Sequence, residues 1–136
     1  MKNKPSKIVL DWINKANSDL EYAKASFNEF DDFYSQMCIL CHDSAEKIFK
    51  AYIVSKKKRY KRIHDLVTLL KDCIQISDQK EDFHNYEEDC RILNNYYTPL
   101  KYPSHFPIAS KKQAKEAINA AENIAKFIQT QIFDPI

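Results

Sequence analysis

The residues best suited to chemistry lie in the stretch 93–107, which mixes aromatic rings, amides, one cation and one histidine. Its three prolines are Pro99, Pro103 and Pro107. Each proline lacks a backbone donor and pushes the residue before it out of the helical region. We therefore expect a helix to end near Thr98 and an extended segment to follow, and its aromatic rings indicate that this segment lies against the protein body.

This stretch has two interpretations. In the first it forms a ligand site, where a cation binds a phosphate, a tyrosine ring stacks on a base, and an amide and an imidazole form hydrogen bonds. The residues predicted to bind in this way are Asn94, Tyr96, Tyr97, Lys101, Tyr102 and His105. In the second, the tyrosines only fix the loop to the core, their hydroxyls pair with the backbone, and the lysine points into solvent.

A second candidate pattern is the sequence RYKRIH at 59–64, inside a run of six cations over 56–62. His64 could act as a general acid or base while Arg59 stabilises charge on a phosphate. The alternative is that His64 begins a helix and hydrogen-bonds to the backbone. The basic run likewise has two interpretations, a solvated helix end or a contact to a phosphate backbone whose affinity depends on salt.

Cysteine spacing gives little support for a metal centre. Cys38 and Cys41 form a C-x-x-C, but it lies in the middle of an expected helix and has no second pair at zinc-finger spacing. We expect these two cysteines, with Cys73 and Cys90, to be free thiols in the core. The sequence therefore predicts no metal site and no cofactor, and no residue is assigned as catalytic.

Composition limits the fold to one helical domain over residues 1–136. Glycine is absent, although all-β proteins and Rossmann units need it at turns and phosphate loops. No apolar run approaches the roughly 20 residues of a membrane span. The start of the chain is basic but soon reaches Asp11 and Asn14, so it does not resemble a signal peptide. We expect a cytoplasmic protein with no membrane contact.

Apolar residues recur at steps of three and four along five segments, which predicts five helices. The first two cover about 6–28 and 32–57. A third is capped by Asp65, a fourth ends near 98, and a fifth starts at Ser110 and carries its apolar stripe from Ala114 to Ile132. Asp78 with Glu81 and Ser110 with Gln113 match the capping-box pattern at the last two helix starts. We expect an all-α, antiparallel up-and-down bundle of five helices.

The chain resembles the small HEPN-domain proteins of bacteria and archaea in four segments, in the family's order. These are WINKANSDL at 12–20, SAEKIFKA at 44–51, HDLVTLL at 64–70 and LNNYYTPLKYP at 93–103. The resemblance implies a helical bundle, usually a homodimer, often encoded beside a small nucleotidyltransferase. Some members are ribonuclease toxins, whereas others bind nucleotides or assist the transferase. It also places the turn with His42 and Glu46 opposite the tyrosine segment, which adds these two residues to the predicted site.

The chain departs from the family pattern in ways that bear on activity. His42, Asp43 and Ser44 stand where the family often has glutamines, and Lys101 stands in place of an arginine. Only arginine offers a planar bidentate fork to a phosphate. The ribonuclease members carry an arginine and a histidine a few residues apart, and 93–107 has no such pair. We therefore expect a non-catalytic nucleotide-binding or nucleotidyltransferase-partner module, the alternative being a metal-independent ribonuclease of a toxin–antitoxin pair.

Overall fold

A computed structural model of the chain describes residues 4–97 and 108–133. Its elements are α1 (Lys7–Glu29), α2 (Tyr34–Ser55), α3 (Leu66–Ile76), α4 (Lys80–His84), α5 (Glu87–Asn94) and α6 (Lys111–Phe133). No strand occurs within the described ranges. The expected all-α class with five helices is confirmed, and the fourth expected helix is divided into α4 and α5 by a turn at Asn85 and Tyr86.

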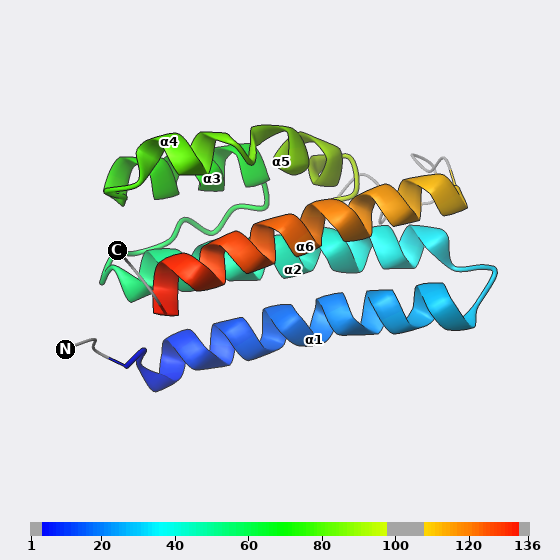
Figure 1. The fold of residues 1–136 in the computed structure, drawn as a ribbon, viewed down its shortest axis with the longest axis horizontal. Helices are drawn as coiled ribbons and strands as arrows, with labels where there is room; N and C mark the ends of the chain where they lie inside the picture. Colours follow the sequence, from blue (N-terminus) through cyan, green and yellow to red (C-terminus); the bar gives the residue numbers. More distant parts are fainter. Residues whose placement is uncertain (1–3, 98–107, 134–136) are drawn as a thin grey trace.

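Helix α2 lies at the centre of the bundle, with α1 along one side and α3 to α5 along the other (Figure 1). It is buried on most of its surface because it packs against both layers and against α6. Its core side chains include Ile48, Phe49 and Tyr52. Polar side chains on such a helix are largely removed from water, so they need hydrogen-bond partners within the protein.

The connection between α2 and α3 sets the direction of the chain at the centre of the molecule. Lys57 has a φ of 60°, in the left-handed region, and ends α2 with a reversal. The chain then returns along α2, so that His64 lies beside His42 and Glu46. Helix α3 consequently runs in the same direction as α2, whereas α1 and α2 run antiparallel, as do α5 and α6 (Figure 1). The uniformly antiparallel order expected from short connections is thus interrupted at one place.

Two of the predicted helix starts are formed as expected. The Asp65 carboxylate accepts the backbone N–H groups of Val67 and Thr68 at 2.9 and 3.2 Å. The backbone N–H of Ser110 donates to Gln113 Oε1 at 2.8 Å, and the backbone N–H of Gln113 donates to Ser110 Oγ at 3.1 Å. Each bond satisfies a donor that the first turn of a helix leaves unpaired.

The capping box predicted from Asp78 and Glu81 is not formed. Helix α4 begins after Gln79, which makes no side-chain cap bond. Instead, Ser77 Oγ accepts the backbone N–H of Gln79 at 2.9 Å. The local turn therefore uses the buried serine rather than the exposed aspartate, and the helix starts later than the pattern predicted.

The four cysteines are free and buried, as expected. Burial raises the pKa of the Cys38 thiol to about 12, and the pKa of Cys41 is raised further by the same cause. Such thiols are poor nucleophiles and poor metal ligands at neutral pH. Among the helices that the structure describes, none is both long enough and apolar enough to cross a membrane.

Candidate functional site

Glu46, in the middle of α2, is the centre of a partly buried polar cluster. Its Oε2 accepts a hydrogen bond from Lys50 Nζ at 2.8 Å, and its Oε1 accepts one from His64 Nδ1 at 2.8 Å. Burial alone would raise the pKa of this carboxyl, but the hydrogen bonds and charges of Lys50 and His64 together outweigh it and lower the pKa. Glu46 is therefore a carboxylate at neutral pH, even though its side chain is only 14% exposed.

His42 lies one turn earlier on the same helix and is 1% exposed. Its Nε2 lies 2.8 Å from the backbone oxygen of His64, and its Nδ1 lies 3.3 Å from Asp43 Oδ1. A carbonyl oxygen only accepts, so Nε2 carries a proton in this arrangement. The ring also stacks on Tyr97, with centroids 5.8 Å apart and planes inclined by 25°. The reversal after α2 thus brings the backbone of His64 into hydrogen-bonding contact with the His42 ring.

An aromatic pair closes the other side of the cluster. The Tyr60 ring lies 5.2 Å from Lys50 Nζ and makes a T-shaped contact with Trp12, with ring centroids 5.3 Å apart. Lys50 is 5% exposed, so its charge is compensated by the Glu46 carboxylate and by the face of this ring. The cluster is therefore preorganised by α1, α2 and the connection 56–65.

The structure brings together three of the predicted site residues, namely His42, Glu46 and Tyr97. Two others are held by contacts within the protein. Asn94 Oδ1 accepts the backbone N–H of Leu66 at 2.8 Å, and its Nδ2 donates to Asp65 at 3.0 Å, which ties the end of α5 to the start of α3.

Tyr96 is the other predicted site residue that the protein itself holds. It is 5% exposed, and burial raises the pKa of its hydroxyl to about 12. The burial of Tyr96 agrees with the second interpretation of the stretch 93–107, in which the tyrosines fix the loop to the core. Lys101, Tyr102 and His105 lie outside the described residues, and their roles stay predictions.

Sequence reasoning missed the part played by His64, Lys50 and Tyr60. The spacing of Glu46 and Lys50 is i, i+4, the usual spacing of an ion pair on a helix, and could have indicated that contact. The sequence pattern at 59–64 favours His64 as a helix start or as the partner of Arg59. Its contact with Glu46 depends on the reversal at Lys57, for which the sequence offers no glycine as a signal.

The basic run lies on the surface beside this cluster. Its exposed members are Lys57, Lys58, Arg59, Lys61 and Arg62. Lys61 pairs with Asp72 at 3.2 Å, and both side chains belong to a surface hollow of about 280 Å³. The other cations in the run are available to attract an anionic ligand towards His64, whose side chain is 56% exposed.

Comparison with known proteins gives the family. The profile of the HEPN domain matches residues 9–131. The chain belongs to the HEPN-domain family. This HEPN chain is similar to a solved structure of TT1696 from Thermus thermophilus, with a TM-score of 0.78, 25% identity, and coverage of 93% of this chain and 99% of that one. The family resemblance carried by the four sequence segments is thus confirmed.

A second solved structure, ST0689, is described as an archaeal HEPN homologue. It matches with a TM-score of 0.70 and 28% identity, over 97% of this chain and 99% of that one. No curated protein matches the sequence. The fold and the family follow from these comparisons, whereas the ligand and the partner must be argued from the site itself.

Proposed function

We propose that this HEPN protein is a non-catalytic module that binds a nucleotide or serves a small nucleotidyltransferase as its partner. The observation that carries the proposal is the meeting of Glu46, His64, His42 and Tyr97 on one face of α2. An ionised carboxylate, an exposed imidazole and a partly exposed ring are the groups that recognise a nucleoside.

The division of roles follows from exposure and charge. Tyr97 offers a ring that can stack on a base, and the exposed Nε2 of His64, whose Nδ1 donates to Glu46, can accept a hydrogen bond from a ribose hydroxyl. The cations of the connection 56–65 attract the phosphates by long-range electrostatics. Lys101, Tyr102 and His105, which follow α5 in sequence, are proposed to complete the site with a cation, a second ring and a second imidazole.

Titration of the full-length protein with AMP and ATP, followed by amide NMR shifts, tests this proposal. We expect the largest shifts at Glu46, His64 and Tyr97, and a loss of binding of at least tenfold in Tyr97→Ala. Phe133→Ala is the matched control, because Phe133 is an aromatic side chain that is 44% exposed and lies at the end of α6. Shifts confined to 56–62, or no shifts at all, would show that the site is wrongly placed.

A second function, metal-independent RNA cleavage, is favoured by one specific contact. The Glu46 carboxylate holds His64 by Nδ1, which leaves Nε2 of a half-exposed imidazole to exchange a proton with a substrate. Arg59 and Arg62, on the same connection, could stabilise charge on a phosphate. The protein would then be the toxin of a toxin–antitoxin pair.

Incubation of the purified protein with total RNA in EDTA separates the two functions. We expect no cleavage. Cleavage that is lost in His64→Ala or His105→Ala but kept in His84→Ala would replace the binding module by the ribonuclease. His84 is a suitable control because it also lies near a glutamate, Glu87 at 3.7 Å, but on α4.

A further inference from the structure

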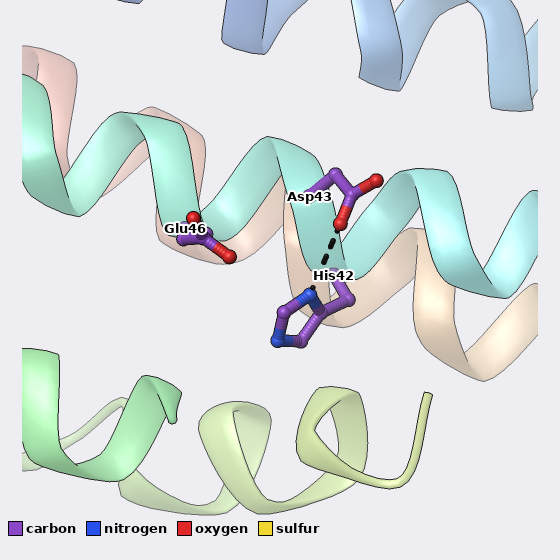
Figure 2. A group of neighbouring side chains, drawn as sticks. All are labelled: His42, Asp43 and Glu46. Carbon is purple, nitrogen blue, oxygen red and sulfur yellow. Dashed lines mark hydrogen bonds and ion pairs between the residues drawn. The ribbon is translucent and has the colours of Figure 1, made fainter. Parts of the chain in front are cut away.

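His42, Asp43 and Glu46 place three ligating atoms within 4.8 Å of one another on a single turn of α2 (Figure 2). We propose that these side chains bind a divalent transition-metal ion, for which Zn²⁺ is the best match. The site is not one that the sequence spacing predicts, and its test needs no nucleotide. A failure to bind zinc would therefore leave the proposed nucleotide binding untouched, and a failure to bind nucleotides would leave the zinc site untouched.

The first argument is the orientation of the His42 ring. The proton on Nε2 is directed at the backbone oxygen of His64, 2.8 Å away. In the neutral ring, Nδ1 is then a lone pair that faces the Asp43 carboxylate across 3.3 Å (Figure 2). Two acceptors repel one another unless a positive charge lies between them. That charge is either a second proton or a metal ion.

The distance between these two atoms favours the metal ion. A charged N–H donor and a carboxylate oxygen lie at about 2.7–2.9 Å, which is shorter than the 3.3 Å observed. Zinc binds nitrogen and oxygen ligands at about 2.0–2.2 Å in a tetrahedron, which separates neighbouring ligand atoms by about 3.3–3.5 Å. Nδ1 and Oδ1 are thus already spaced as one edge of such a site.

Glu46 provides the third ligand, and its neighbours hold it in place. Each oxygen of the carboxylate accepts one hydrogen bond, from Lys50 or from His64, and keeps a second lone pair for a metal. Metal-binding histidines usually donate their other N–H to a carbonyl, as His42 does, and metal-binding carboxylates are themselves hydrogen-bonded. The cluster therefore has the outer contacts of a metal site as well as the ligands.

The set of donors indicates which ion would bind. One imidazole and two carboxylates give three ligands of the types that zinc takes in proteins, with a fourth position left for water or a ligand oxygen. Imidazole nitrogen suits zinc, cobalt and nickel, whereas magnesium prefers six oxygen ligands and retains its water. The Asp43 side chain is 29% exposed, which gives an ion a path from solvent.

The experiment is calorimetric titration of the chelator-treated full-length protein with ZnCl₂, and with MgCl₂ for comparison. We expect one zinc ion per chain, no measurable magnesium binding, and at least tenfold weaker zinc binding in Asp43→Asn and in Glu46→Gln. The matched control is His84→Gln, which removes an exposed histidine near a carboxylate and should bind zinc as the wild type does. Thermal unfolding by circular dichroism confirms that each variant is folded.

Several results would overturn the proposal. These are the absence of zinc binding, wild-type affinity in Asp43→Asn, or a loss in His84→Gln equal to that in the other variants. If Glu46→Gln fails to fold, the test depends on Asp43→Asn. The Asp43 side chain is less deeply buried than that of Glu46, so this variant should fold. A thiolate-to-cobalt absorption band with Co²⁺ would assign the metal to cysteines such as Cys38 and Cys41 and would equally exclude the site on α2.

Discussion

Glu46 is the side chain on which most of the polar cluster depends. Its carboxylate lies between the Lys50 ammonium and the His64 ring, and Lys50 is too deeply buried for water to take the place of this carboxylate as its partner. The triplet of His42, Asp43 and Glu46 could not be recognised from sequence, because its spacing of i, i+1 and i+4 is common on helices. What distinguishes it is the His64 carbonyl, which reaches His42 only after the chain has returned along α2.

Replacing Glu46 by glutamine should therefore destabilise the fold. Glutamine keeps the shape but leaves the Lys50 ammonium buried without a counter-charge, which costs about 3 kcal/mol in similar cases. Urea denaturation measures the change. Glu21→Gln is the matched control, because its pair with Lys24, at 3.5 Å, is exposed and should contribute no more than about 0.5 kcal/mol. Equal effects of the two substitutions would show that burial of the pair is unimportant.

Asp65 gives a prediction that depends on pH. Burial would raise the pKa of its carboxyl, but hydrogen bonds from Asn94 and from the amides of Thr68 and Val67 outweigh it and lower the pKa. A lowered pKa means that the stabilisation is complete above the unfolded value of about 3.9 and is lost as the pH falls through the folded value. We expect Asp65→Ala to cost about 1 kcal/mol at pH 7 and progressively less below pH 4.

The cost of Asp65→Ala is measured by urea denaturation at pH 7 and at pH 3, and substitution of the exposed Asp78 is the control. It precedes α4 but makes no cap bond there, so Asp78→Ala should change stability by less than about 0.5 kcal/mol at either pH. A cost for Asp65→Ala that stayed constant from pH 7 to pH 3 would contradict the assignment of the stabilisation to the ionised carboxylate.

At the level of helices, apolar periodicity predicted the long elements well and their directions less well. The stripe that begins at Ala114 is buried over its whole length, and the stripe that begins at Val9 is buried except for the half-buried Trp12 and Phe27, because each follows one face of a regular helix. Periodicity carries no information on a reversal, so the parallel run of α2 and α3 was not predicted. The division into α4 and α5 was also missed, since the apolar spacing continues across Asn85 and Tyr86.

Helix α4 has only five residues, and Phe83 holds it in place. This side chain is fully buried, with ring centroids 5.0 Å from Tyr52 and 4.8 Å from Phe127. We expect Phe83→Ala to lower the free energy of unfolding by about 3–5 kcal/mol. Phe133→Ala, on a side chain that is 44% exposed, should change it by less than about 1 kcal/mol in the same urea experiment. Similar losses in both variants would contradict a structural role for α4.

At the scale of the whole molecule, the family and the all-α architecture could be predicted from four ordered segments, whereas the arrangement of the candidate site residues could be predicted only in part. His42, Glu46 and Tyr97 were expected near one another through the family resemblance, and in the structure His42 stacks on Tyr97 and lies one turn before Glu46. The sequence could not show that Asn94 and Tyr96 are engaged in internal contacts. Whether an amide binds a ligand or fixes a helix end depends on which backbone groups lie within about 3 Å of it.

The last prediction concerns the subunit contact of the proposed homodimer. The family resemblance implies a dimer, but most of the apolar stripes of α1 and α6 is buried inside the chain and is not available to a partner. The large apolar side chains that remain exposed include Tyr22, Phe30 and Phe33, around a hollow of about 300 Å³ where α1 turns into α2. Contiguous patches of this kind typically mark a contact surface, and a twofold dimer is the commonest closed arrangement.

Light scattering at micromolar concentration should therefore give twice the chain mass of 16.0 kDa, and Phe33→Asp should halve it. Aspartate suits this position because Phe33 has a φ of 66°, a region that aspartate tolerates better than phenylalanine. Ile8→Asp is the control, since Ile8 is 56% exposed but lies at the opposite end of α1. A wild-type mass equal to that of one chain would rule out the dimer. A Phe33→Asp variant that stays dimeric would place the contact on another face of the bundle.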